Sequence, residues 1–132
     1  MNKYEINGYV ILLLIDKFFP KSVFQVQQLF MLWEERILPV LSQNTLKTEL
    51  LVRDDGNPVW KTRIVKAISE LLNMEYINRA YPYSMQYQRY AITDFGKNVI
   101  AAPSQGIKEK LSGNELFLSR EIEEVIKNIH IK

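Results

Sequence analysis

The stretch that most constrains the fold of this chain runs from residue 58 to residue 93, where a long amphipathic helix leads directly into two short β-rich segments. At about 100° per residue, five apolar side chains fall within one arc of the helix: Trp60, Ile64, Ala67, Ile68 and Leu71. The opposite side carries short polar and cationic residues: Thr62, Lys66 and Ser69, flanked by Arg63 and Glu70. This spacing predicts one buried face and one face left to solvent.

Turn-forming residues mark both ends of this helix, which we expect over residues 58–73. Gly56 is available for a positive φ, and Pro58 suits the first turn of a helix. Asn73 tolerates the left-handed conformation that closes many helices, so we expect it to end this one. Residues 76–81 and 87–93 are rich in β-forming side chains and predict a hairpin between them.

Helices are also predicted before this unit. Residues 4–18 are apolar on most faces, which indicates a buried helix. Ser22 is followed three residues later by Gln25, a capping-box pattern that heads a second predicted helix running to about Leu38. Residues 44–52 suit a short buried helix.

Two further helices are predicted after the hairpin. Thr93 and Asp94 can cap a short helix ending near residue 100, although Gly96 weakens it. The predicted organisation is a domain over residues 1–102, a linker over 103–113 and a C-terminal helix over 114–132.

The C-terminal helix carries a regular apolar stripe: Leu118, Ile122, Val125, Ile126 and Ile129. Such a stripe is covered either by the first helix of the same chain or by the same helix of a second copy. We favour the second arrangement, a homodimer through residues 114–130.

Composition excludes most catalytic chemistry. The chain has no cysteine and one histidine, His130, so we expect neither a thiol nucleophile nor a metal cluster. Glu121, Glu123 and Glu124 are expected to lie on a solvated helix face, since nothing near them supplies a nucleophile or a second catalytic group. We predict no enzymatic activity, no cofactor and no metal site.

Apolar segments are short. The longest run, residues 9–15, is well below the roughly 20 residues that cross a bilayer, and no small-residue cleavage site follows it. We therefore expect a cytoplasmic protein without a membrane partner.

Positive charge is concentrated in one part of the chain. Residues 57–93 hold five basic and two acidic groups, a net charge of +3, whereas residues 1–56 carry −1 and residues 94–132 carry zero. The excess coincides with the helix and hairpin, which favours a nucleic-acid partner.

Residues 60–79 and 90–96 resemble winged-helix DNA-binding domains. In those domains the recognition helix ends in a leucine, a tight cap and an apolar pair, and the wing ends in a Thr-x-x-Gly step into the next helix. Residues 39–100 are most similar to the N-terminal domain of Mrr-type restriction endonucleases, in which a tryptophan and an arginine also open the helix, as Trp60 and Arg63 do. The resemblance implies a mainly α fold with a small β-hairpin, a winged helix-turn-helix with extra N- and C-terminal helices. It also implies double-stranded DNA as the partner. Asn73 and Met74 depart from the usual Ala-Gly or Gly-Leu step, and no Glu-x-Lys pair completes a nuclease site.

Candidate DNA contacts follow from this arrangement. On the helix they are Lys61, Thr62, Arg63, Lys66 and Ser69, and on the hairpin Arg79, Tyr83, Gln86 and Arg89. Glu70 would repel phosphates unless it pairs with Lys66 or accepts from a cytosine amine.

Five of the seven tyrosines lie between residues 76 and 90, and some must be exposed because strand residues alternate between faces. A protein–protein adaptor that docks through this tyrosine-rich wing is therefore the alternative function.

Overall fold

The computed structural model describes residues 8–41, 56–80, 88–101 and 120–129. The predicted helix over 44–52, the hairpin tip with Tyr83 and Gln86, the linker and His130 lie outside these ranges. Within them, the chain is mainly helical with one small antiparallel sheet, as the sequence predicts.

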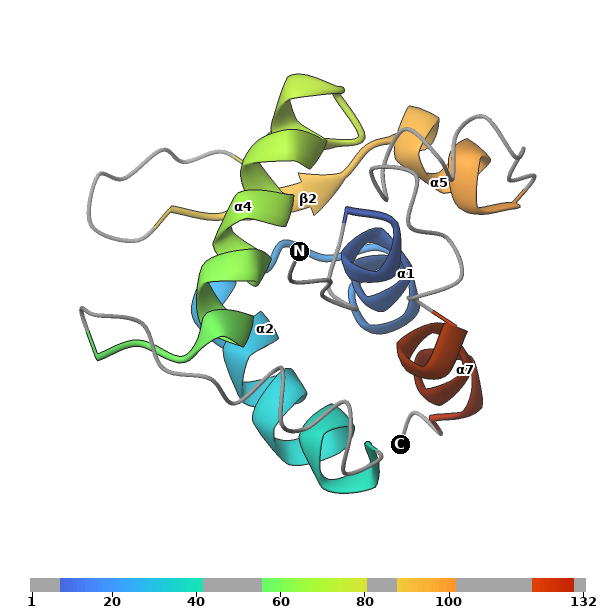
Figure 1. The fold of residues 1–132 in the computed structure, drawn as a ribbon. Helices are drawn as coiled ribbons and strands as arrows, with labels where there is room; N and C mark the ends of the chain where they lie inside the picture. The colour runs from blue at the N-terminus through green and yellow to red at the C-terminus, as the bar shows by residue number, and fades with distance from the viewer. Residues whose placement is uncertain (1–7, 42–55, 81–87, 102–119, 130–132) are drawn as a thin grey trace.

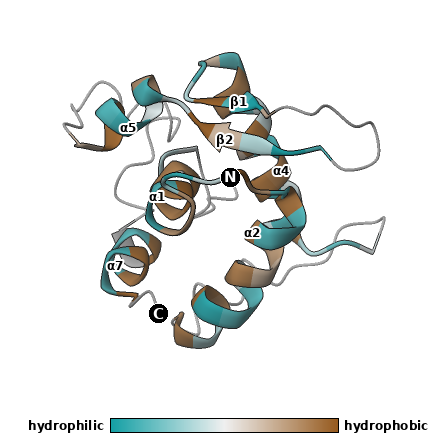
Figure 2. Cartoon of the chain, turned by 180° about the vertical axis from the view of Figure 1, so that it is seen from behind, coloured by the Kyte–Doolittle hydropathy of each residue, from teal (hydrophilic) through white to brown (hydrophobic). Residues whose placement is uncertain are grey.

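A central helix, α1 (Gly8–Phe18), organises the core. Six of its side chains are at most 2 % exposed: Tyr9, Val10, Ile11, Leu12, Leu14 and Ile15. Three helices pack against it: α4 (Val59–Asn73), α5 (Asp94–Ala101) and α7 (Arg120–Asn128). Figures 1 and 2 show α1 between α4 and α7 from opposite sides. A helix that is apolar on nearly all faces is stable in water only when it is enclosed in this way.

The second helical segment changes type along its length. α2 (Val26–Leu32) continues into a π-helical turn, η1 (Trp33–Ile37), and a 3-10 turn, η2 (Leu38–Val40). The N–H of Leu38 donates to the carbonyl of Trp33, five residues back, just before Pro39, which has no N–H to continue the helix. Trp33, the first residue of this widened turn, is fully buried.

The start of α2 corrects the capping-box prediction at Ser22. Phe24 forms a β-bridge with Tyr90 through two backbone hydrogen bonds of 2.8 Å, so the backbone is extended there and the helix begins only afterwards. Gln25 and Gln28 provide the cap instead. Gln28 Oε1 accepts from the Gln25 N–H at 2.8 Å, and the Gln28 N–H donates to the Gln25 carbonyl at 3.0 Å.

The predicted hairpin is confirmed in its two strands. β1 (Ile77–Arg79) pairs antiparallel with β2 (Tyr90–Ile92), with Ile77 opposite Ile92 and Arg79 opposite Tyr90. Tyr90 also pairs with Phe24 on its other side. A single residue from the loop between α1 and α2 thereby extends the sheet by one segment.

α4 matches its predicted pattern of burial. All five residues of the apolar arc are buried: Trp60, Ile64, Ala67, Ile68 and Leu71. Gly56 takes the positive φ expected of it, 86°. Pro58, however, is the N-cap with an extended ψ of 149°, so the helix begins at Val59 and not at the proline.

The end of α4 differs from the prediction that Asn73 closes the helix in a left-handed conformation. Asn73 is still helical, and the left-handed residue is Glu75, with φ 63°. The Glu75 N–H donates to the Leu72 carbonyl at 3.1 Å, and the Tyr76 N–H donates to the Leu71 carbonyl at 3.0 Å. These two bonds form a Schellman motif in which a glutamate occupies the position that glycine usually takes.

Replacing Glu75 with glycine should stabilise the protein. A side chain with a Cβ costs about 1 kcal/mol in the left-handed region, and glycine avoids this cost. We expect the free energy of unfolding of Glu75→Gly, measured by urea denaturation, to exceed that of the wild type by about 1 kcal/mol. Glu75→Ala is the matched control, since it also removes the carboxylate but keeps the Cβ. An equal gain in both variants would contradict the backbone explanation.

The helix after the hairpin begins at a junction with the end of α4. Thr93 Oγ1 accepts from the Gly96 N–H at 2.9 Å, which caps α5 as predicted, and lies 2.8 Å from the Glu75 carbonyl, to which it donates. A Cβ built on Gly96 would overlap the carbonyl oxygen of Tyr76. This close approach therefore requires glycine at position 96. The sequence predicted only that Gly96 weakens the helix.

α7 packs against α1 of its own chain. Ile122 and Ile126 are at most 1 % exposed, and Lys17 Nζ donates to the carbonyls of Ile126 at 2.7 Å and Lys127 at 2.8 Å. A lysine at this position satisfies carbonyls at the C-terminal end of a helix and complements its dipole. The structure thus shows the intramolecular arrangement, and the favoured pairing of two copies through residues 114–130 receives no support from it.

Glu123 corrects the prediction of a solvated acidic face on α7. It is only 9 % exposed and forms a salt bridge of 3.2 Å with Lys127. Burial raises the pKa of Tyr9, and the negative charge of Glu123 raises it further, while Lys127 opposes the shift. Glu123 therefore belongs to the contact between α1 and α7, whereas Glu124 is exposed as predicted.

Candidate nucleic-acid interface

One side of α4 is left to solvent and carries a straight line of polar residues. Thr62, Lys66, Ser69 and Asn73 succeed one another at intervals of three or four residues, the spacing that places side chains on one side of a helix. We call this line the outward stripe. It extends for roughly 16 Å at 1.5 Å per residue. Lys66, Ser69 and Asn73 are exposed and Thr62 is partly exposed, so three of the predicted contacts share one surface.

Asn73 was not among the predicted contacts. Its spacing from Ser69 and Lys66 places it on the outward stripe, and this signal is present in the sequence. Asn73 was omitted from the predicted contacts because it was expected to close the helix in a left-handed conformation. Because the C-cap is Met74 and the left-handed residue is Glu75, the helix extends far enough for Asn73 to present its amide to solvent.

Lys61 and Arg63 flank the stripe and are less available than predicted. Lys61 is half-buried, with its Nζ 5.5 Å from the ring centre of Phe30 and 5.6 Å from that of Trp60. These contacts hold the ammonium group toward α2. Arg63 is half-buried and already has an interaction partner in the protein. The exposed cation of α4 in this region is therefore Lys66.

Glu70 lies beside the stripe with part of its carboxylate buried. Its Oε1 is inaccessible to solvent and has no hydrogen-bond partner among the residues that the structure describes. Burial raises the pKa of Glu70, and the positive charge of Lys66 partly opposes the shift. The predicted attraction between Glu70 and Lys66 is thus present, but Oε1 of Glu70 has no hydrogen-bond partner among the described residues.

Neutralising Glu70 should stabilise the fold at neutral pH. Because its pKa is higher in the folded than in the unfolded protein, the charge costs stability above the carboxylate range and costs none once both states are protonated. We expect Glu70→Gln to raise the free energy of unfolding at pH 7 by about 1 kcal/mol and the gain to vanish in acid. Urea denaturation across pH measures this, with the exposed Glu124→Gln as control. A gain that persists in acid would rule out the electrostatic cause.

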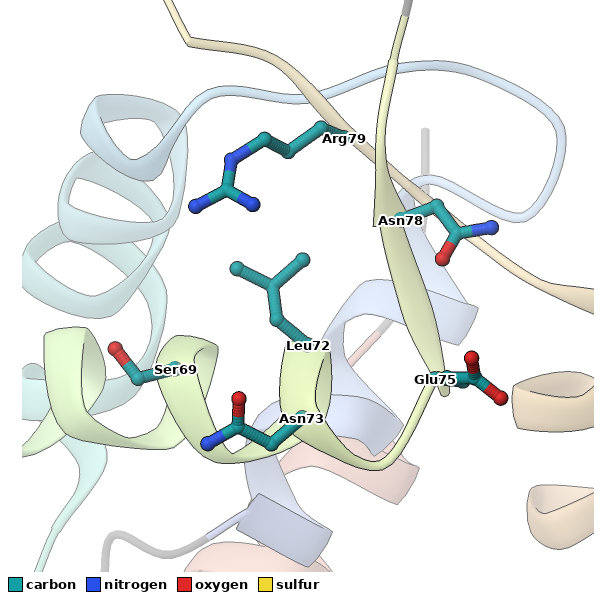
Figure 3. Close-up of a pocket in the computed structure, with 6 residues that line it drawn as sticks. All are labelled: Ser69, Leu72, Asn73, Glu75, Asn78 and Arg79. Carbon is teal, nitrogen blue, oxygen red and sulfur yellow. The ribbon is translucent and has the colours of Figure 1, made fainter.

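The hairpin supplies two further exposed cations, Arg79 and Arg89. Arg79 ends β1, and the Ala80 N–H donates to the Arg89 carbonyl at 2.8 Å, so Arg89, the residue before β2, lies close to the end of β1. Residues two apart in a strand share a face, so Arg79 shares the face of the buried Ile77. In Figure 3 its guanidinium extends from β1 back over Leu72 at the end of α4.

An open depression of about 590 Å³ lies where α4 and β1 meet. It is lined by six residues: Ser69, Leu72, Asn73, Glu75, Asn78 and Arg79 (Figure 3). Two of these, Ser69 and Arg79, were predicted contacts from separate elements, and the structure brings them together with Asn73. The depression continues the outward stripe onto the hairpin.

The tyrosines of the hairpin that the structure describes are core residues. Tyr76 is 2 % and Tyr90 6 % exposed, and the Tyr90 ring packs against Phe24 with ring centres 5.8 Å apart. The Tyr90 hydroxyl donates to Gln88 Oε1 at 2.7 Å. Tyr83 and Gln86 lie outside the described residues, so the tyrosine-rich surface predicted for the tip stays a prediction.

Within the described ranges, no group of three or more His, Cys, Asp or Glu side chains is placed to hold a metal ion. Among the same residues, no helix combines the length and apolar character needed to cross a bilayer.

No protein-family model matches this chain, and searches of curated proteins and of solved structures found no match either. The features of this chain that bear on its function are therefore the outward stripe, the hairpin cations and the depression between them.

Proposed function

We propose that this protein binds double-stranded DNA without catalysis, as a winged-helix protein that places the outward stripe of α4 in the major groove and the β1–β2 hairpin against the backbone. In this proposal Thr62, Lys66 and Ser69 line the face of α4 that enters the major groove, and the positive charges of Lys66, Arg79 and Arg89 neutralise phosphates.

The order of elements supports the winged-helix assignment. A helix (α1), a short extended segment at Phe24, a second helix (α2), the amphipathic α4 and an antiparallel hairpin follow one another along the chain. The Phe24–Tyr90 bridge joins the extended segment to the hairpin, which gives the small sheet that accompanies the helices in winged-helix domains. α4 lies against α1 and α2 through its apolar face, so its polar face is available to a partner.

The observation that carries the proposal is the continuity of exposed cationic and hydrogen-bonding groups from α4 to the hairpin. Lys66, Arg79 and Arg89 are all exposed, and the intervening depression connects the two elements. Lysine and arginine neutralise phosphates, while short polar side chains on a helix can enter a major groove.

Duplex binding across a salt series tests the proposal. Fluorescence anisotropy with a labelled mixed-sequence duplex should give an affinity that falls with salt, and three phosphate contacts predict a slope of about −3 in log affinity against log salt concentration. Absence of salt-dependent binding by the wild type, even at low ionic strength, would refute the proposal.

Light scattering on the same sample reports the mass, and burial of Ile122 and Ile126 within the chain favours a monomer.

A protein–protein adaptor is the second candidate. Val65, on the flank of the outward stripe, is 49 % exposed, and an apolar residue beside polar groups suits a protein interface. This function predicts a stoichiometric protein partner whose binding is lost on Val65→Asp. If the surface binds DNA instead, the duplex affinities of Val65→Asp and Lys66→Gln should differ by less than tenfold. Comparing Val65→Asp with Lys66→Gln for DNA binding separates the two candidates.

A further inference from the structure

The side chains around the depression divide into two groups. In Figure 3, Ser69, Leu72, Asn73 and Arg79 lie on one side of β1, whereas Glu75 and Asn78 lie on the other. Alternation along the strand explains this division, because the neighbours Asn78 and Arg79 must point to opposite faces. The first group presents a guanidinium, a hydroxyl and an amide above one apolar side chain.

The polar groups on this side are not engaged within the part of the chain that the structure describes. There, the side chains of Ser69, Asn73 and Arg79 form no hydrogen bond or ion pair with one another or with other described residues. Ser69, Asn73 and Arg79 are also exposed. Three donors from two elements therefore surround the same open space without a hydrogen-bond partner among the described residues.

We infer that this side of the depression, formed by Arg79, Asn73 and Ser69, holds one phosphate group of the DNA backbone and thereby fixes the register of α4 along the duplex. The inference rests on the proposed function. A phosphate oxygen accepts from guanidinium, amide and hydroxyl donors at once, and arginine binds it through two parallel N–H groups.

The position of the site on the helix favours a phosphate over a base edge. Residues near the N-terminal end of a recognition helix reach base edges, whereas Asn73 is the last residue of α4. Arg79 approaches from the hairpin, which lies beside this end of the helix. A group held between the helix end and the hairpin therefore lies at the margin of the groove, where the backbone runs.

Two features oppose an anion here. The C-terminal end of α4 carries the negative end of the helix dipole, and Glu75 lines the depression. Glu75 lies on the opposite side of β1 from the guanidinium in Figure 3, and the full charge of Arg79 exceeds the partial charge of a helix end. The net effect on the arginine side is attraction.

Salt-dependent duplex binding by variants of this chain tests the inference. Arg79→Gln should lower affinity at about 50 mM salt about tenfold and reduce the salt slope by about 1, because one phosphate contact is lost. Asn73→Ala and Ser69→Ala should each weaken binding about threefold with the slope unchanged, since they remove neutral donors. All three positions are exposed, and circular dichroism melting verifies that each variant folds.

Two matched controls sharpen the result. Asn78→Ala removes an amide from the adjacent strand position on the opposite face, and Lys97→Gln removes one positive charge from α5, outside both the outward stripe and the depression. Neither should change affinity more than about twofold. If wild-type protein binds duplex with a steep salt slope but Arg79→Gln has the same slope, the phosphate site is refuted while the proposed function stands.

A titration with inorganic phosphate distinguishes a phosphate group of the DNA backbone from free phosphate as the ligand of this site. Backbone amide NMR signals of Asn73 and Arg79 should shift only weakly and without saturation at millimolar phosphate, because the other contacts of a duplex are missing. Saturable shifts, combined with duplex affinity that is independent of Arg79, would identify a site for free phosphate and overturn the assignment to DNA.

Discussion

Gly96→Ala should lower the free energy of unfolding by about 3 kcal/mol and the melting temperature by roughly 10 °C. An alanine Cβ would overlap the Tyr76 carbonyl oxygen and would lie 3.1 Å from Ile92 Cγ1. The carbonyl cannot move freely, because it accepts the Thr93 N–H at 3.0 Å at the junction between the end of α4 and the start of α5. The new methyl group must therefore separate α5 from the hairpin.

The sign of this effect makes the test decisive. At an ordinary helix position, glycine to alanine stabilises a protein by up to about 1 kcal/mol. Asn98→Ala, at an exposed position of the same helix, is the control and should change stability by less than about 0.5 kcal/mol. Thermal and urea denaturation provide the measurement. A stabilised Gly96→Ala protein would show that α5 does not approach the Tyr76 carbonyl as closely as the structure shows.

Lys66→Glu should reduce duplex affinity at about 50 mM salt by about a hundredfold and lower the salt slope by about 2. Lys66 is the exposed cation of the outward stripe, so reversing its charge removes one phosphate contact and adds a repulsion. The replacement also creates a Glu–Glu pair with Glu70 at i,i+4, which costs the helix only a few tenths of a kcal/mol. Loss of binding therefore cannot be attributed to unfolding if melting shifts by only a few degrees.

The same charge reversal on another surface is the control for Lys66→Glu. Lys97→Glu on α5 changes the net charge equally, but Lys97 belongs to neither the outward stripe nor the depression. We expect it to reduce affinity less than threefold, through the general field alone. Similar losses in both variants would mean that DNA is held by overall charge and not by the outward stripe.

The buried half of α4 was predictable because its signal is local. The positions of Trp60, Ile64 and Leu71 obey the helical period, and burial of that face requires no knowledge of its partners. Thr93 likewise revealed the start of α5, because an N-cap depends only on the residues that follow it. Such features are set by the chain within a turn or two.

The features that were missed depend on residues distant in sequence. Ser22 could not be rejected as a cap without knowing that Phe24 pairs with Tyr90, and Gly96 could not be understood without the position of the Tyr76 carbonyl. The phosphate site combines Asn73 with Arg79 from a strand whose direction is set by the left-handed turn at Glu75. A glutamate in that conformation is not expected from its intrinsic preferences.

The clamp of Lys17 on α7 has a consequence for the order of folding. Its two hydrogen bonds join residues 109 and 110 positions apart and attach the C-terminal end of α7 to α1. α1 is synthesised before α7 and stays incompletely covered until α7 has left the ribosome, so the nascent chain exposes part of an apolar helix until then. A chain interrupted before α7 is therefore expected to aggregate through the apolar surface of α1 that α7 otherwise covers.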